Sequence, residues 1–220
     1  MQRHFEQIEE ELKDRLLYMG SLAEEMIARA VQALVERKRE SLAKVHTDEE
    51  QVNRLHIEID ERCLKLLALY QPAAADLRFI VACVKINADL ERIADQAVNI
   101  AQTTDVLLGQ PLLERKLLGI PRMAQVARGM LKDSLDAVVK KDPQAARSVV
   151  ARDEEEDHLK SEAFRDLLSL MQSDPACIQR ALGLILISRN LERIADHATN
   201  IAEDVIFMAL GKDIRHHNAR

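Results

Sequence analysis

The sequence predicts an all-α protein built from two tandem three-helix bundles that arose by internal duplication. Three observations predict this fold: the composition, the spacing of apolar residues and a repeated motif. The chain of 220 residues contains only 6 Gly and 5 Pro, and it is rich in the helix formers Ala, Leu, Glu and Arg. Apolar residues recur every three or four positions over long stretches, as they do along one face of a helix. An all-β fold is therefore excluded.

Three long helices are expected in the first half. The first covers roughly 30 residues, because apolar residues between Phe5 and Leu34 follow the helical period. The second runs from about Ser41 to Tyr70. Pro72 opens the third helix, which continues to Leu108, because proline is tolerated in the first turn of a helix but not in its interior.

The second half follows the same plan after a stretch rich in Gly and Pro. Pro143 and Pro175 each follow an aspartate, an arrangement that is common at helix starts. The expected helices cover residues 121–140, 143–172 and 175–210. The Gly and Pro residues between 109 and 121 place the boundary between the halves, which gives one domain over 1–110 and a second over 111–220.

A repeated motif supports the duplication. Leu-Glu-Arg-Ile-Ala-Asp occurs at residues 90–95 and again, identically, at residues 191–196. In both copies the match extends to the pattern LERIADxAxNIA. Two halves of three helices that share such a motif indicate two similar bundles.

The polar residues of the motif form an acidic stripe beside its apolar face. At the helical rotation per residue, the first copy groups three of them within an arc of about 80°, and the second copy does the same. Two carboxylates four residues apart repel each other, so a positive charge is expected beside them. Either Arg92 and Arg193 supply it or a bound cation does. The residues of the stripe are Glu91, Asp95 and Asn99 in the first copy, and Glu192, Asp196 and Asn200 in the second, where Asp204 extends it by one turn.

The register of the neighbouring helices adds facing pairs of oxygen ligands. Glu49 and Asn53 lie about as many residues before Pro72 as Asp95 and Glu91 lie after it, so two antiparallel helices would place them level. Asp153 and Asp157 have the same relation to the second stripe about Pro175. Oxygen-only sets of this kind suit hard or borderline cations such as Mg²⁺, Mn²⁺ or Fe. Acidic pairs on a helix are also common as solvated charge, and both interpretations stay open at this point.

Composition and motifs limit the class of protein. The net charge of −6 and the absence of Trp argue against binding to nucleic acid. No signal peptide is expected, and the three cysteines form no CxxC pair, which favours a reducing cytoplasm. There is no P-loop, no GxSxG and no nucleophile paired with a base, so a binding protein is expected rather than an enzyme.

The sequence resembles the PhoU family of phosphate-transport regulators over nearly its whole length. The residues that carry the resemblance are Phe5–Ala30, the segment QPAAADLR at 71–78, both LERIAD copies and the ending at 211–216. One position departs from the pattern, because Asn53 stands where the family often has Asp.

The resemblance implies a cytoplasmic protein that often forms homodimers. It implies a negative regulator of the phosphate-starvation response that links the ATPase subunit of a phosphate ABC transporter to a phosphate-sensing histidine kinase. It also implies bound metal ions, with Mg, Mn, Fe or Zn as candidates. Two alternatives remain, a carboxylate-bridged metal enzyme of the di-iron type and a metal-free helical adaptor. The metal ligands that the resemblance implies are Glu49, Asn53, Glu91, Asp95, Asn99, Asp153, Asp157, Glu192, Asp196 and Asn200.

Overall fold

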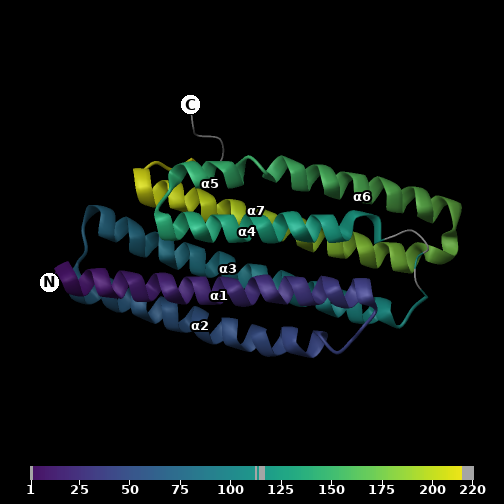
Figure 1. The fold of residues 1–220 in the computed structure, drawn as a ribbon, viewed down its shortest axis with the longest axis horizontal. Helices are drawn as coiled ribbons and strands as arrows, with labels where there is room; N and C mark the ends of the chain where they lie inside the picture. The colour runs from purple at the N-terminus through teal and green to yellow at the C-terminus, as the bar shows by residue number, and fades with distance from the viewer. Residues whose placement is uncertain (1, 112, 114–116, 215–220) are drawn as a thin grey trace.

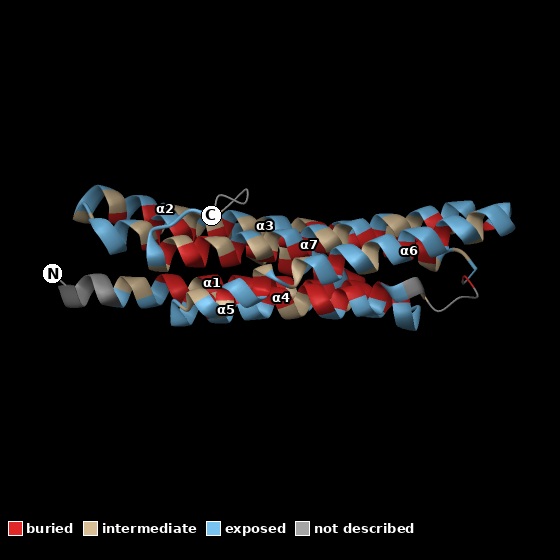
Figure 2. Ribbon diagram, turned by 90° about the horizontal axis from the view of Figure 1, so that it is seen from above, coloured by how far each residue is buried: buried red, intermediate tan, exposed pale blue. Residues whose placement is uncertain are grey.

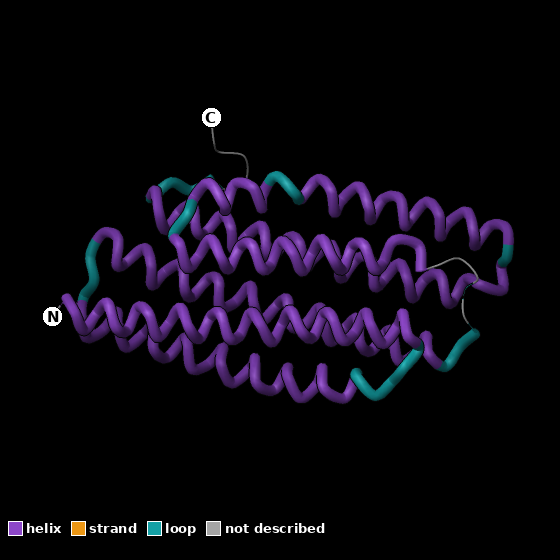
Figure 3. The backbone as a smooth tube through the Cα atoms, in the orientation of Figure 1, coloured by secondary structure: helices purple, strands orange, loops and turns teal. Residues whose placement is uncertain are grey.

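The computed structural model describes residues 2–111, 113 and 117–214, so the last two residues of the 211–216 segment lie outside it. Every regular element of this described part is helical, which confirms the predicted all-α fold (Figures 1 and 3). The helices of the first half are α1 (Gln2–Glu36), α2 (Leu42–Tyr70) and α3 (Ala74–Leu108). The second half contains the 3₁₀ turn η1 (Leu117–Gly119), α4 (Ile120–Lys140), α5 (Pro143–Val150), α6 (Asp153–Ser173), the 3₁₀ turn η2 (Pro175–Cys177) and α7 (Ile178–Leu210).

The single helix expected over residues 143–172 was a wrong prediction. The chain turns at Ala151 and Arg152, which separates α5 from α6. Both residues keep right-handed helical dihedrals, so the apolar period runs through the turn and gives no sign of it. The Arg152 side chain reaches α4, where its Nη1 donates to Asp133 Oδ2 at 2.6 Å. The break creates a new helix N-terminus at Asp153.

Two of the proline-marked starts are shifted from the predicted ones. Helix α3 begins at Ala74 rather than at Pro72: Gln71 adopts a left-handed conformation (φ 46°) that ends α2, and Ala73 is still extended (φ −123°, ψ 157°). Pro175 opens η2, whose first turn is capped by the Asp174 carboxylate accepting from the Ala176 amide at 3.1 Å. The remaining helix limits agree with the prediction within a few residues.

The helices pack in two layers. Figure 2 shows α2, α3, α7 and α6 in one layer, and α1, α4 and α5 in the other. Helices α3 and α7 lie side by side and run in opposite directions, which joins the two halves along the centre of the molecule (Figure 1). Because the two copies of the LERIAD motif lie on α3 and α7, the acidic stripes belong to the same layer.

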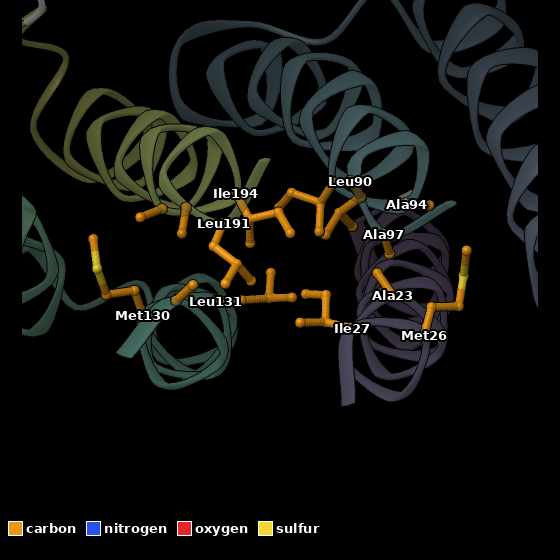
Figure 4. Close-up of a cluster of buried hydrophobic side chains, with 14 of the residues drawn as sticks. Ala23, Met26, Ile27, Leu90, Ala94, Ala97, Met130, Leu131, Leu191 and Ile194 are labelled. Carbon is orange, nitrogen blue, oxygen red and sulfur yellow. The ribbon is translucent and has the colours of Figure 1, made fainter. Parts of the chain in front are cut away.

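One continuous hydrophobic core serves both halves. Ile27 of α1, Leu90 of α3, Leu131 of α4 and Leu191 of α7 converge in it (Figure 4). All four side chains are fully buried. The boundary predicted between domains 1–110 and 111–220 therefore separates sequence repeats that share a core.

The duplication is visible in an ion pair that occurs twice with opposite polarity. When the repeats are aligned on their buried positions, Arg29 is equivalent to Asp133 and Asp48 is equivalent to Arg152. In the first half Arg29 of α1 pairs with the buried Asp48 of α2. In the second half Asp133 of α4 pairs with Arg152 at 2.6 Å. The two halves thus carry opposite charges at these two places, in opposite order.

The three cysteines are buried and unpaired. Burial raises the pKa of the Cys63 thiol to about 12, and the nearby Asp60 carboxylate adds to this effect. All three side chains therefore belong to the hydrophobic core. None of the described helices is long and apolar enough to cross a membrane.

Candidate metal centre

The second acidic stripe faces the N-terminal turns of α6. Lys160 Nζ donates to Asp157 Oδ1 at 2.7 Å and to Glu192 Oε1 at 2.7 Å, so it joins the two helices. These two hydrogen bonds raise the pKa of Lys160. Thr199 Oγ1 of α7 donates to Asp153 Oδ1 at 3.2 Å. Two of the expected α6 ligands therefore lie close to the expected α7 stripe, with Lys160 as a resident positive charge.

Glu156 is a buried carboxylate in the middle of this group. Its side chain is 1% exposed, and neither carboxylate oxygen has a hydrogen-bond partner. Burial raises its pKa to about 8, and the charges of Glu155, Glu192 and Asp153 contribute to the shift. The equivalent residue of the first half is the buried Val52. The fold accepts an apolar side chain at this position, so the carboxylate is not needed for packing.

Burial and neighbouring carboxylates raise the pKa of two further members of the cluster, Asp196 and Asp153. Burial raises the pKa of Asp196 to about 6, with Glu192 as the largest electrostatic contribution. Burial also raises the pKa of Asp153, although the Thr199 hydroxyl opposes the shift. A cation among these oxygens would remove the repulsion, because an opposite charge within a few ångströms favours the ionised form. The positive end of the α6 helix dipole acts in the same direction.

The first acidic stripe already has a cation from the chain itself. Arg92 lies with its Nε 3.5 Å from Glu91 Oε2 and its Nη1 3.5 Å from Asp95 Oδ2. On α2, His46 Nδ1 lies 3.7 Å from Glu49 Oε2, and Asn53 is exposed. Arg92 therefore lies where the expected arginine partner of the stripe would be. In the second half Arg193 forms no ion pair with a described residue, and Lys160 has this role instead.

No three His, Cys, Asp or Glu side chains within the described ranges are arranged to hold a metal ion. The ten expected ligands therefore stay a prediction. The second-half residues nevertheless fit a metal, because they offer oxygen donors and a buried carboxylate with no partner. The first-half residues fit less well, because Arg92 occupies the stripe and Asn53 carries no charge.

Comparison with known proteins gives the family. The PhoU domain model matches residues 16–104 and 120–205. The chain belongs to the PhoU family. A phosphate-specific transport system accessory protein PhoU homolog of Pseudomonas putida is 40% identical over 94% of this chain and 81% of its own length. The homolog of Aquifex aeolicus is 35% identical over 96% of this chain and 95% of its own.

Two solved structures share the fold. PhoU from Pseudomonas aeruginosa matches with a TM-score of 0.91 at 36% identity, over 94% of this chain and 100% of that one. The phosphate transport system regulatory protein PhoU from Streptococcus pneumoniae matches with a TM-score of 0.87 at 27% identity, over 95% and 98% of the two chains. These matches confirm the resemblance to the PhoU family and the two repeats. The relatives are named as accessory and regulatory proteins, which agrees with the expectation that the chain is not an enzyme.

Several polar residues of this PhoU protein join α3 to α7. Asp204, expected as an extension of the second stripe, is buried and pairs with Lys85 of α3. Asp89 Oδ1 lies 2.8 Å from His197 Nδ1 and accepts from Asn200 Nδ2 at 3.3 Å. Lys85, Asp89, Asn200 and Asp204 border a cavity of about 1100 Å³ between α3, α7 and the α5–α6 turn. Asn200 therefore has a protein partner, and Asp204 contributes to the contact between the halves.

Glu155 and His158 form an ExxH motif, a pattern that can bind metal, but in the structure the two side chains contact other residues. Arg122 Nη2 donates to Glu155 Oε1 at 2.7 Å, whereas His158 Nε2 lies 3.4 Å from Glu162 Oε1.

Glu156 was missed by sequence reasoning, because helical spacing placed it among charged neighbours. Alignment of the two repeats could have revealed it, since a buried Val52 stands at the equivalent position.

Proposed function

We propose that this PhoU protein is a regulator of phosphate uptake and a negative regulator of the phosphate-starvation response. It acts as a metal-binding adaptor between the ATPase subunit of a phosphate ABC transporter and a phosphate-sensing histidine kinase. The names of the relatives support the regulatory part, since they describe accessory and regulatory proteins of phosphate transport. The observation that supports the metal-binding part is the buried, unpartnered Glu156 among other carboxylates.

The adaptor mechanism uses the charge of the α6–α7 face. Without a metal, Lys160 holds Asp157 and Glu192 together. A cation bound by Asp153, Asp157, Glu192 and Asp196 competes with Lys160 for the same oxygens and releases its side chain. The net charge and the side-chain arrangement of this face then change, and a partner that docks there distinguishes the two states. Candidate ions are Mg, Mn, Fe and Zn, and oxygen donors favour the first three.

The first-half stripe contributes a weaker site in this proposal. Its ligands are Glu49, Asn53, Glu91, Asp95 and Asn99. A cation there competes with Arg92, which carries a permanent positive charge and lies 3.5 Å from both acidic side chains. The second half therefore binds metal first.

The proposed setting is cytoplasmic, because both partners act on that side of a membrane. The protein works as a homodimer and reaches the membrane only through its partners. No nucleic acid takes part, in agreement with the net charge of −6.

The test is alkaline-phosphatase activity in phosphate-rich medium, in cells that lack the gene and in cells that carry a restored copy. High activity without the gene, and low activity with the intact chain, is the expected result. Glu192→Ala/Asp196→Ala should fail to repress. The matched control Glu162→Ala/Asp166→Ala removes two exposed carboxylates elsewhere on α6 and should repress normally.

Other outcomes would separate the alternatives. Equal activity with and without the gene contradicts the regulatory function. Full repression by a folded Glu192→Ala/Asp196→Ala protein contradicts the metal mechanism and favours the metal-free adaptor. Redox turnover by the iron-loaded protein favours the carboxylate-bridged enzyme.

A further inference from the structure

A groove of about 520 Å³ lies between α6 and α7, beside the acidic cluster and beyond Lys160. Phe164 and Arg165 line it from α6, and Ile185 and Arg189 line it from α7. Its volume falls in the range of sites that hold one large side chain or a small ligand. Neither the proposed metal site nor the hydrophobic core accounts for Phe164, Arg165 and Arg189 in this groove.

The groove carries an excess of positive charge, because its one lining carboxylate, Glu192, is paired with Lys160, and Arg165 and Arg189 line it as well. Among the described residues, Arg165 donates only to the main-chain oxygen of Ser161 in its own helix, at 3.3 Å. Arg189 forms no hydrogen bond or ion pair with any residue of the described chain. Both side chains are exposed. In a chain of net charge −6, two neighbouring arginines that remain unpaired form a local site for an anion.

The same groove exposes apolar surface. Phe164 is 48% exposed, and Leu168, one turn further along α6, is 42% exposed. Helix α6 buries only three of its residues against the rest of the protein, Glu156, Ala163 and Leu167. Guanidinium groups beside an exposed aromatic ring are typical of surfaces that bind other proteins.

The fold itself does not require this chemistry, as the first half shows. Two alignments give the equivalent residues of the first half. The buried positions that pair Val52 with Glu156 align α2 with α6, and the LERIAD motif aligns α3 with α7. The repeat therefore keeps the helices but reverses the charge of this surface. In place of Phe164, Arg165 and Arg189, the first half has Asp60, Glu61 and Ala88.

We propose that the α6–α7 groove binds an acidic peptide segment of a partner protein that carries one large apolar side chain. The apolar side chain occupies the space between Phe164 and Ile185, and flanking carboxylates pair with Arg165 and Arg189. The inference rests on the proposed adaptor role only for the existence of a partner. Because Lys160 and Glu192 border the same groove, the segment lies next to the metal-binding face.

The experiment is fluorescence anisotropy of the full chain with a labelled synthetic peptide of about twelve Asp and Glu residues around one central Leu. Binding in the micromolar range that weakens with added salt is expected. Arg165→Glu/Arg189→Glu should weaken binding by at least about tenfold, and Phe164→Ala should also weaken it. The control Arg54→Glu/Arg147→Glu makes the same charge change at two exposed arginines on α2 and α5 and should bind normally.

Four results would overturn the proposal. These are absence of binding, equal binding of a peptide with Gly in place of Leu, equal loss of binding in the control variant, and tighter binding of a Lys peptide. Dissociation of a dimer by Arg165→Glu/Arg189→Glu would show instead that a second copy fills the groove. Binding in vitro is measured without the phosphate response, so failure here leaves the alkaline-phosphatase result unaffected.

Discussion

Glu156 makes the stability of this PhoU protein depend on pH. Burial and the neighbouring carboxylates raise its pKa from 4.5 to about 8 in the folded chain. A carboxyl group whose pKa is higher in the folded state favours folding while it is protonated. Its contribution is fully present below the unfolded pKa of 4.5 and is lost as the pH rises through the folded pKa of about 8. The free energy of unfolding should therefore fall between these two values.

The size of the effect follows from the two pKa values. Between about pH 6 and about pH 8, the unfolded group is ionised and the folded group is still titrating, so roughly 2 kcal/mol is lost. Asp196 contributes little in this interval, because its pKa is about 6. Substitution of Glu156 by Gln removes the titration and keeps the shape of the side chain.

The assay is urea unfolding followed by helical circular dichroism, in the presence of a chelator, at several pH values. The difference in unfolding free energy between the intact chain and Glu156→Gln should change by about 2 kcal/mol across the interval. Glu156→Val, which copies Val52 of the first half, should show the same pH dependence as Glu156→Gln. Parallel pH curves for the intact chain and both variants would refute the assignment of a buried, protonatable Glu156.

Three further predictions concern packing. Asp48→Arg should destabilise the fold by about 3 kcal/mol, because it opposes Arg29, and the double variant with Arg29→Asp should recover at least half of that loss. Leu191→Ala should cost about 2–5 kcal/mol, because its side chain is fully buried in the core shared by both halves. Cys63 should not react with a thiol reagent in the native protein at neutral pH, because burial raises its pKa to about 12.

Each packing prediction has a control. Leu182→Ala, at a side chain that is 49% exposed, should cost less than about 0.5 kcal/mol. Denaturant should expose Cys63 to the reagent. The charge-exchange prediction is contradicted if the double variant recovers less than half of the stability that Asp48→Arg loses. Equal unfolding free energies for Leu191→Ala and Leu182→Ala would contradict the prediction for Leu191.

Local rules predicted the helices well. The apolar period and the prolines at 72, 121, 143 and 175 gave the long helical segments, and the repeated LERIAD motif gave their arrangement in two halves. The turn at Ala151–Arg152 was missed, because two residues with helical dihedrals disturb the period too little to be seen. The ion pair of Arg152 with Asp133 does not explain the turn, since the equivalent pair of Asp48 with Arg29 involves an unbroken α2.

The site was harder to predict, because spacing within one helix does not show which helices meet. The pair of Lys85 with Asp204 and the contact of His197 with Asp89 both join α3 to α7, and their partners are more than a hundred residues apart. For the same reason spacing did not reveal that Lys160 contacts both Asp157 and Glu192. Sequence spacing found the acidic residues but could not assign their partners.

The central claim is that the carboxylates on α6 and α7 bind a cation. The most direct test is elemental analysis of the purified protein after incubation with Mg, Mn, Fe or Zn and removal of unbound metal. The intact chain and the control Glu162→Ala/Asp166→Ala should retain the same amount of one metal, and Glu192→Ala/Asp196→Ala should retain less. Equal metal content in all three proteins would contradict the claim.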